Sequence, residues 1–194
     1  MALVDVHYLG VSSLGSQHAD CLVLWWAERT RALPIWISPE AASALRKRPI
    51  WEDIYRPDAV SALVDVLNAG DDPIRELAIT GQHQGTFYAE IVLDSDRKIE
   101  LRPSDLVAVH MLTKLPVRVE EEVLAETSVF LPVAEVLRTF DFLVRDGEEV
   151  YLSGSYQLDE TTSGVDDEPH EFGVDDEEFA AFMRELGVSD EDLT

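Results

Sequence analysis

The fold is decided by a stretch that reads Gly85-Thr-Phe-Tyr-Ala-Glu-Ile-Val-Leu93 and is followed nine residues later by Arg102-Pro-Ser-Asp105. Alternating side chains predict a strand that presents Thr86, Tyr88 and Glu90 on one face and apolar residues on the other. The Arg-Pro-Ser-Asp motif is typical of a helix start. A strand with a polar face is therefore expected beside a newly begun helix.

Neighbouring runs extend this unit into an antiparallel meander followed by a helix and another strand. The expected strands cover residues 74–80, 86–93, 98–102 and 116–119, with connections at 81–85 and 94–97. Ser104 is predicted to cap the helix, which runs to Thr113. These elements predict an α+β (α/β) fold with a mixed, largely antiparallel sheet and about three flanking helices.

The N-terminal part supplies the remaining strands and helices of that sheet. We expect a strand over residues 3–11, a loop over 12–20, a hairpin of strands over 21–26 and 31–37, and helices over 39–45 and 58–69. Ser38 and Pro39 favour the start of the first helix, and Gly70 ends the second. The nearly continuous apolar content of the hairpin predicts strands covered on both faces.

Length and charge bound the organisation. The 194 residues contain 46 % hydrophobic residues, enough for one domain with an extension. Three parts are predicted: the domain at 1–126, additional elements at 127–156, and an acidic linker with a C-terminal amphipathic helix at 157–194. Within 127–156, a helix over 132–140 and a hairpin of 142–144 with 150–152 compete for residues 140–144.

The chain is strongly acidic, with a formal net charge of −24. Residues 157–194 hold 14 acidic residues and one Arg, which leaves −11 for residues 1–156. Affinity for a phosphate backbone comes mainly from cationic side chains, so nucleic acid is a possible partner that the charge disfavours. In the C-terminal helix Phe179, Phe182, Met183 and Leu186 form a stripe that is expected to dock on its own domain or on a protein partner.

Membrane and redox signals are weak. The N-terminus has no basic n-region, and the longest apolar run, residues 21–27, is too short to span a bilayer, so we expect no membrane contact and a cytoplasmic location. The single Cys21 cannot form an internal disulfide and is expected to act as a small hydrophobe. A homodimer is our mild preference, because exposed sheet edges are often closed by symmetry.

Three motifs in one order resemble the bifunctional nuclease (BFN) domain family: Leu33-Pro-Ile-Trp-Ile-Ser38, the Gly85–Asp105 stretch, and Pro116-Val-Arg-Val-Glu-Glu-Glu-Val123. The resemblance covers residues 3–126, and the acidic tail is similar to that of some actinobacterial members. It implies nuclease activity on DNA and RNA. Many relatives carry Thr-His-Asp after the Arg-Pro of the second helix, where this chain reads Arg56-Pro-Asp-Ala.

Phosphodiester hydrolysis needs charge neutralisation and an activated water. We expect Glu90 and Asp105 to act as catalytic residues that bind a divalent metal, Mg²⁺ or Mn²⁺, and Arg102 to contact the phosphate, with Glu40 and Glu100 as outside candidates. Each has a structural alternative: Asp105 as a first-turn acid, Arg102 in a surface ion pair, and Glu90 as a solvated strand residue.

A base and a binding surface complete the hypothesis. His83, expected in the turn before Gly85, is the general-base candidate. The basic cluster Arg46-Lys47-Arg48 is expected in a loop with Trp51 and Tyr55, a pattern that suits single-strand binding. The favoured interpretation is structural, because a helix C-terminus collects Lys and Arg without any ligand. The remaining predicted substrate contacts are Thr86, Tyr88 and Ser104.

Two functions stay open. The first is a nuclease that hydrolyses phosphodiester bonds with metal assistance. The second is a non-catalytic regulatory or protein-interaction module, whose tail of net charge −13 mimics nucleic acid.

Overall fold

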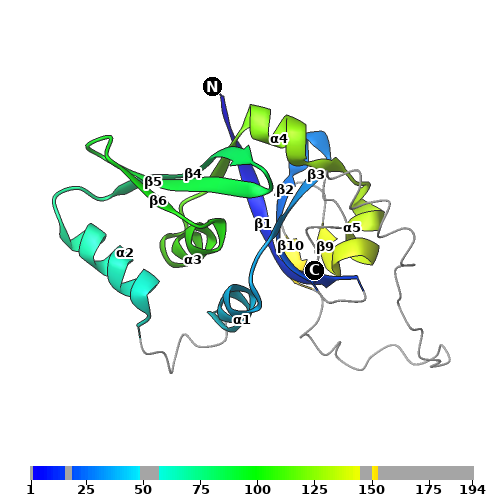
Figure 1. The fold of residues 1–194 in the computed structure, drawn as a ribbon, viewed down its shortest axis with the longest axis horizontal. Coiled ribbons are helices and arrows are strands. Elements are labelled where there is room, and N and C mark those ends of the chain that lie inside the picture. The colour runs from blue at the N-terminus through cyan, green and yellow to red at the C-terminus, as the bar shows by residue number, and fades with distance from the viewer. Residues whose placement is uncertain (1, 16–18, 49–56, 145–149, 153–194) are drawn as a thin grey trace.

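The computed structural model of the chain describes residues 2–15, 19–48, 57–144 and 150–152 (Figure 1). The large sheet contains β1 (Leu3–Leu14), β2 (Ala19–Trp26), β3 (Arg31–Trp36), β4 (Ile74–His83), β5 (Thr86–Leu93), β6 (Lys98–Leu101), β7 (Val117–Glu120) and β8 (Val129–Phe130). A small hairpin consists of β9 (Phe142–Val144) and β10 (Val150–Leu152). The helices are α1 (Pro39–Lys47), α2 (Ala59–Ala69), α3 (Pro103–Thr113), α4 (Glu121–Thr127) and α5 (Val133–Phe140).

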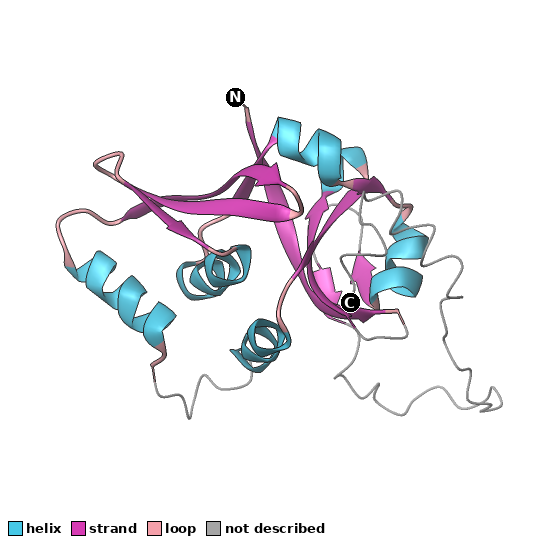
Figure 2. Ribbon diagram, viewed as in Figure 1, coloured by secondary structure: helices cyan, strands magenta, loops and turns pink. Residues whose placement is uncertain are grey.

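The eight strands follow the order β6-β5-β4-β7-β1-β2-β3-β8. Strands β4 and β7 pair in parallel, and every other neighbouring pair is antiparallel. Helices α1, α2 and α3 lie together on one side of the meander β4–β6, and α4 lies on the other side (Figure 2). The predicted α+β fold with a mixed, largely antiparallel sheet is therefore confirmed.

Two strands extend further than the sequence predicts. Strand β1 runs on to Leu14, because Ser12, Ser13 and Leu14 continue the pairing with β2, so the loop expected at 12–20 is shorter. Strand β4 continues to His83. Only Gln84 and Gly85 then form the turn, with φ values of 50° and 78°, as a tight hairpin turn requires.

The helix starts follow capping chemistry, with one correction. The Ser38 hydroxyl accepts a hydrogen bond from the Ala41 N–H, and Asp58 accepts one from the Ser61 N–H at 2.8 Å. The predicted cap of α3 was wrong: Arg102 occupies the N-cap position and Pro103 follows it, so Ser104 already lies inside the first turn and is buried. Helix α1 also extends to Lys47, two residues beyond the expected end.

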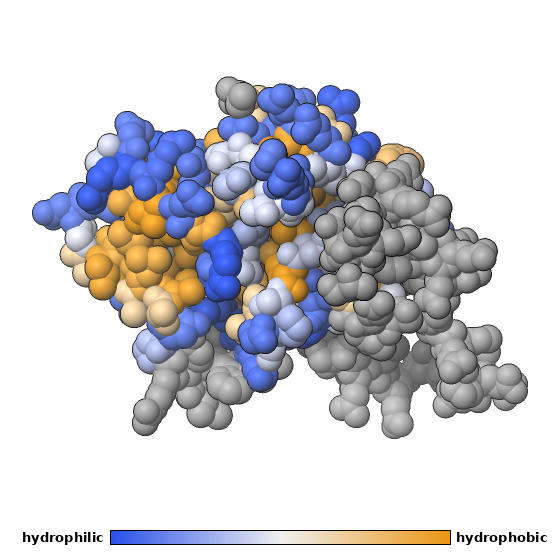
Figure 3. Space-filling model, in the orientation of Figure 1, coloured by the Kyte–Doolittle hydropathy of each residue, from blue (hydrophilic) through white to orange (hydrophobic). Residues whose placement is uncertain are grey.

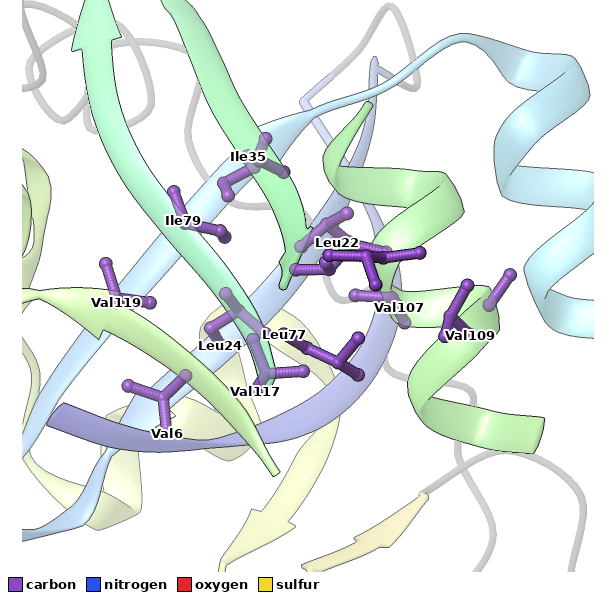
Figure 4. Close-up of a cluster of buried hydrophobic side chains, with 14 of the residues drawn as sticks. Val6, Leu22, Leu24, Ile35, Leu77, Ile79, Val107, Val109, Val117 and Val119 are labelled. Carbon is purple, nitrogen blue, oxygen red and sulfur yellow. The ribbon is translucent and has the colours of Figure 1, made fainter. Parts of the chain in front are cut away.

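The main core lies between the sheet and helices α1–α3 (Figure 4). Leu77 and Ile79 of β4 belong to the same core as Val107 and Val109 of α3, and all four are fully buried. Leu22 of β2 contributes to the same core. Because β4 and β5 turn their apolar residues toward α3, their other face is left for polar side chains.

A second core covers the opposite face of the N-terminal strands. Cys21, Val23 and Trp25 of β2 pack here with Val136 and Phe140 of α5. The near-continuous apolar sequence of β2 is thus explained by burial on both faces, as predicted. Burial of Cys21 and, to a smaller extent, the charge of Asp20 raise the pKa of the thiol to about 12.

The competition over residues 140–144 is resolved in favour of both elements in succession. Helix α5 ends at Phe140, Asp141 adopts a left-handed conformation with φ 61°, and β9 begins at Phe142. Helix α4 was not predicted. The predicted C-terminal helix and acidic linker at 157–194 lie outside the described residues.

The described surface is mixed in character. Apolar side chains gather over the region of α2 in Figure 3, where Val66 is 70 % exposed. Across the described ranges, no helix has the length and apolar character needed to cross a membrane.

Candidate functional site

A hollow of about 540 Å³ opens where residues 35–38, 85–88 and 100–104 meet, and we name it the strand-edge hollow. It lies between the end of β3, the start of β5 and the passage from β6 into α3. Its polar lining consists of Ser38, Thr86, Tyr88, Glu100, Arg102 and Ser104. Three distant segments of the chain are thus brought to one concave place.

The register of the meander explains why a hollow forms here. Strand β6 pairs with β5 only from Ala89 to Val92. Beyond Leu101 the chain leaves the sheet and begins α3 at Pro103, so residues 86–88 have no strand neighbour on the β6 side. Free strand edges expose backbone donors and acceptors. The hollow therefore combines an open strand edge with side chains from two helix starts.

Both helix starts at the hollow favour negative charge. Ser38 and Arg102 occupy the N-cap positions of α1 and α3, and both residues line the hollow. The first N–H groups of a helix are unpaired by the helix itself and carry a partial positive charge. Together with the guanidinium of Arg102 they favour a negative charge at the hollow, which the carboxylates of Glu100 and Asp105 oppose.

Arg102 is held in position by Asp105. Its Nε lies 2.8 Å from Asp105 Oδ2, and its Nη2 lies 3.1 Å from Oδ1. This hydrogen bonding, aided by the charge of Asp105, raises the pKa of Arg102 above its usual value. The Arg102 side chain is nevertheless 72 % exposed, so its remaining donors face solvent. Asp105 thus orients a cation that stays accessible.

A second hollow of about 190 Å³, the helix-start hollow, adjoins the first and shares Ser38, Arg102 and Ser104 with it. Glu40, Arg48, Asp58 and Asp105 also line it. Arg48 Nη2 lies 2.5 Å from Asp58 Oδ2. Hydrogen bonds from the backbone of Glu40 and from the Ser38 side chain lower the pKa of Glu40. Helices α1, α2 and α3 all begin around this hollow.

Glu90 lies apart from both hollows. Its carboxylate is 2.5 Å from Lys98 Nζ. Its neighbours Ala89 and Ile91 point into the core that contains α3, so Glu90 projects from the opposite face of the sheet. The structure therefore does not bring Glu90 and Asp105, the two predicted metal ligands, to a common site.

The donor set also does not match a metal centre. Both carboxylate oxygens of Asp105 accept hydrogen bonds from Arg102, and Glu90 is bound by Lys98. Within the described ranges, no group of three or more His, Cys, Asp or Glu side chains is placed to hold a metal ion. The residues present thus do not fit the predicted divalent cation.

The basic cluster belongs to a helix, which corrects the expected loop. Arg46 and Lys47 form the last turn of α1, and Arg48 follows as its C-cap. Arg46 Nη2 lies 2.6 Å from Asp20 Oδ1, whereas Arg48 points to Asp58 in the helix-start hollow. Lys47 is exposed. The three cations therefore diverge, and Trp51 and Tyr55 lie outside the described residues.

His83 is the last residue of β4 rather than part of the turn, and it pairs with Thr86 across the hairpin. It is exposed and stands beside residues that line the strand-edge hollow without lining it. His110, in contrast, packs edge-on against Tyr8 and has its Nδ1 at 2.7 Å from the Leu115 carbonyl. Of the predicted site residues, the strand-edge hollow brings together Thr86, Tyr88, Arg102 and Ser104.

Sequence reasoning missed two contributors to the strand-edge hollow. Ser38 was read only as a helix cap, and Trp36 only as a strand residue, although both line it. Glu100 was an outside candidate and is the carboxylate that shares this lining with Arg102. The sequence shows the helix-start patterns Ser38-Pro39 and Arg102-Pro103. It does not show that these two helix starts lie close together in the folded protein.

These features define an α+β domain whose sheet ends in a cation-bearing hollow beside two helix starts. The chain belongs to the bifunctional nuclease domain family, which matches residues 22–132. Similar curated proteins are the uncharacterized proteins MT1877 and Rv1829 of Mycobacterium tuberculosis, from strains CDC 1551 / Oshkosh and ATCC 25618 / H37Rv. Each is 32 % identical over 128 residues, which cover 66 % of this chain and 78 % of the relative.

Proposed function

We propose that this protein is a nuclease that hydrolyses phosphodiester bonds in DNA and RNA. One observation carries the proposal: the family match at residues 22–132 contains every segment of the strand-edge hollow, namely 35–38, 85–88 and 100–104. The hollow offers what the reaction needs on the phosphate side, since an exposed guanidinium and two helix starts favour the charge of a phosphoryl group.

The roles follow from the lining. Arg102 contacts the non-bridging oxygens of the phosphate and stabilises the charge that develops on them. Glu100 accepts a proton from the attacking water, whose oxygen bonds to phosphorus while the bond to the leaving oxygen breaks and that oxygen takes a proton from solvent. Glu100 replaces Glu90 in our proposal, because it shares the hollow with Arg102 and has no ion-pair partner among the described residues. His83 remains a second candidate for the base.

The test is cleavage of single-stranded DNA and RNA by purified protein, in parallel reactions with EDTA, Mg²⁺ or Mn²⁺. We expect Arg102→Gln and Glu100→Gln each to lower the cleavage rate about 100-fold, the usual loss for one charge-stabilising or proton-accepting group. A His83→Ala variant in the same assay tests the other base.

The chain offers matched controls for both substitutions. Arg138 forms an i,i+3 pair with Glu135, as Arg102 does with Asp105, but it lies on α5 away from the hollow. Glu90 stands directly opposite Glu100 in the sheet register. Arg138→Gln and Glu90→Gln should retain activity within about twofold. No cleavage in any reaction, or equal cleavage by Arg102→Gln and wild type, overturns the proposal.

We also propose a cytoplasmic location, on the sequence arguments alone, and a homodimer. Strands β6 and β8 form the two edges of the large sheet, and paired edges are a common route to symmetrical dimers. Light scattering in solution measures the molecular mass. The mass of a monomer at micromolar protein concentration would contradict the dimer proposal.

A further inference from the structure

We infer that the strand-edge hollow binds one unstacked nucleotide, with its base against the ring of Tyr88 and its phosphate at Arg102. The inference rests on the proposed function, because it specifies the substrate of the same site as single-stranded nucleic acid. The inference also gives Tyr88 a role in substrate selection, although its side chain takes no part in the hydrolysis.

Tyr88 is unusual among the described aromatic residues. It is 42 % exposed, and Phe130 is the other aromatic among the large apolar side chains that the described surface exposes. Phe130 lines neither hollow, whereas Tyr88 lines the strand-edge hollow. An exposed aromatic ring beside a concave, polar site is suited to stacking with a flat ring.

The backbone beside Tyr88 supports its ring. Gly81 is the residue that faces Tyr88 in the β4–β5 pairing. A Cβ at Gly81 would lie 3.5 Å from Tyr88 Cδ2, so the ring sits close to the glycine backbone. The ring is therefore held by the sheet on one side, and a base that stacks on it meets a surface that needs little ordering.

The polar end of the hollow suits a phosphate. Arg102 supplies an exposed fork of donors, and Thr86 and Ser104 supply hydroxyls in the same lining. The volume of about 540 Å³ lies within the range of about 300–1,000 Å³ typical of small-ligand sites. One hollow thus brings together space, an aromatic residue and a cation, the three components that a nucleotide site needs.

The same arrangement selects single strands over duplex. In a duplex each base is stacked and paired, so its face is not available to a side chain. A base in a single strand can be turned out to stack on an aromatic ring. Stacking also explains how a chain of net charge −24 can bind a polyanion, since it relies on one cationic contact rather than a long basic track.

The experiment measures equilibrium binding in EDTA of a fluorescein-labelled 12-nucleotide oligothymidylate, an abasic strand with the same phosphates, and a 12-base-pair duplex. We expect the abasic strand and the duplex to bind at least tenfold more weakly than the oligothymidylate. One phosphate contact predicts a salt slope of about −0.7 on a log–log plot. A slope several times steeper would indicate backbone tracking and overturn the inference.

Variants separate the ring from its surroundings. Tyr88→Ala should weaken oligothymidylate binding at least tenfold and leave abasic-strand binding unchanged, while Tyr88→Phe, which keeps the ring, should stay within about twofold. Phe130→Ala is the control for loss of an exposed aromatic elsewhere. If Tyr88→Ala binds the oligothymidylate as tightly as wild type does, the inference is wrong. If Tyr88→Ala binds more weakly while Tyr88→Phe binds normally, misfolding is not the cause of the weaker binding.

The outcomes for this inference and for the nuclease proposal are distinct. Base-dependent binding without cleavage under any condition removes the nuclease and leaves the nucleotide site. Cleavage that needs Arg102 but is indifferent to Tyr88, together with equal binding of abasic and normal strands, leaves the nuclease and removes the nucleotide site.

Discussion

The N-terminal hairpin and the central meander are parts of one sheet, yet they differ in how their faces are used. Strand β2 is covered by the main core on one face and by α5 on the other. Strand β5 packs on α3 with one face and keeps Thr86, Tyr88 and Glu90 on the other. Strands that are buried on both faces therefore contribute mainly to stability. The meander is buried on one face only, so its polar side chains and its free edge are available to form a site.

The largest expected effect tests the stability half of this comparison. Leu24→Ala in β2 removes a fully buried side chain from the main core and should lower the free energy of unfolding by about 3 kcal/mol. Glu90→Ala on the open face of β5 removes an ion pair with the exposed Lys98 and should lower it by less than about 1 kcal/mol. Urea denaturation measures both, and equal losses would break the comparison.

A second prediction uses the thiol buried within β2. Its pKa is about 12 in the folded protein against an ordinary value of 9.0, so the unfolded chain loses this proton first as pH rises. Stability from Cys21 is complete below pH 9 and is lost between pH 9 and 12, by about 1.4 kcal/mol per unit at most. Unfolding free energies at pH 8 and pH 10 should therefore differ by about 1.4 kcal/mol more in wild type than in Cys21→Ala. Identical pH dependence in the two proteins would show that the thiol titrates normally.

The third and smallest effect concerns the hairpin that borders the strand-edge hollow. Gly85 has φ +78°, where a side chain is strained although no atom lies within 4 Å of an added Cβ. Gly85→Ala should therefore lower the free energy of unfolding by about 1 kcal/mol through the backbone alone. Gly81→Ala places its Cβ in ordinary contact with Tyr88 and should change it by less than about 0.5 kcal/mol. Thermal unfolding measures the stability of both variants. A larger loss of stability in Gly81→Ala than in Gly85→Ala would contradict this prediction.

Sequence patterns predicted those parts of the fold that depend on local chemistry. The alternation over residues 86–93 and the Ser38 cap were visible, because side-chain periodicity and cap hydrogen bonds are local. Helix α4 was missed, since its acidic first turn shows few apolar residues until Val123 and Leu124. Strand β1 was ended too early, because two serines conceal pairing that only the partner strand reveals.

The candidate site was predicted only in part, for a physical reason. Alternation shows that Thr86, Tyr88 and Glu90 share a strand face, but it does not show where the neighbouring strand stops. Strand β6 pairs with β5 at Glu90 but not at Tyr88. The hollow therefore includes Thr86 and Tyr88 and excludes Glu90. Glu90 lies beside Lys98 on the sheet surface, and Glu100 takes the place beside Arg102.

Strand β1 has a consequence for how the chain reaches its folded state. It lies inside the sheet, between β2 and β7, and Asp5 contacts Arg118 across 113 positions of sequence. During synthesis β1 and β2 can pair early, but the other side of β1 stays open until β7 has been made. Pairing between such distant segments slows folding. The exposed edge of β1 is thus the place where a chaperone or a second nascent chain would compete with β7.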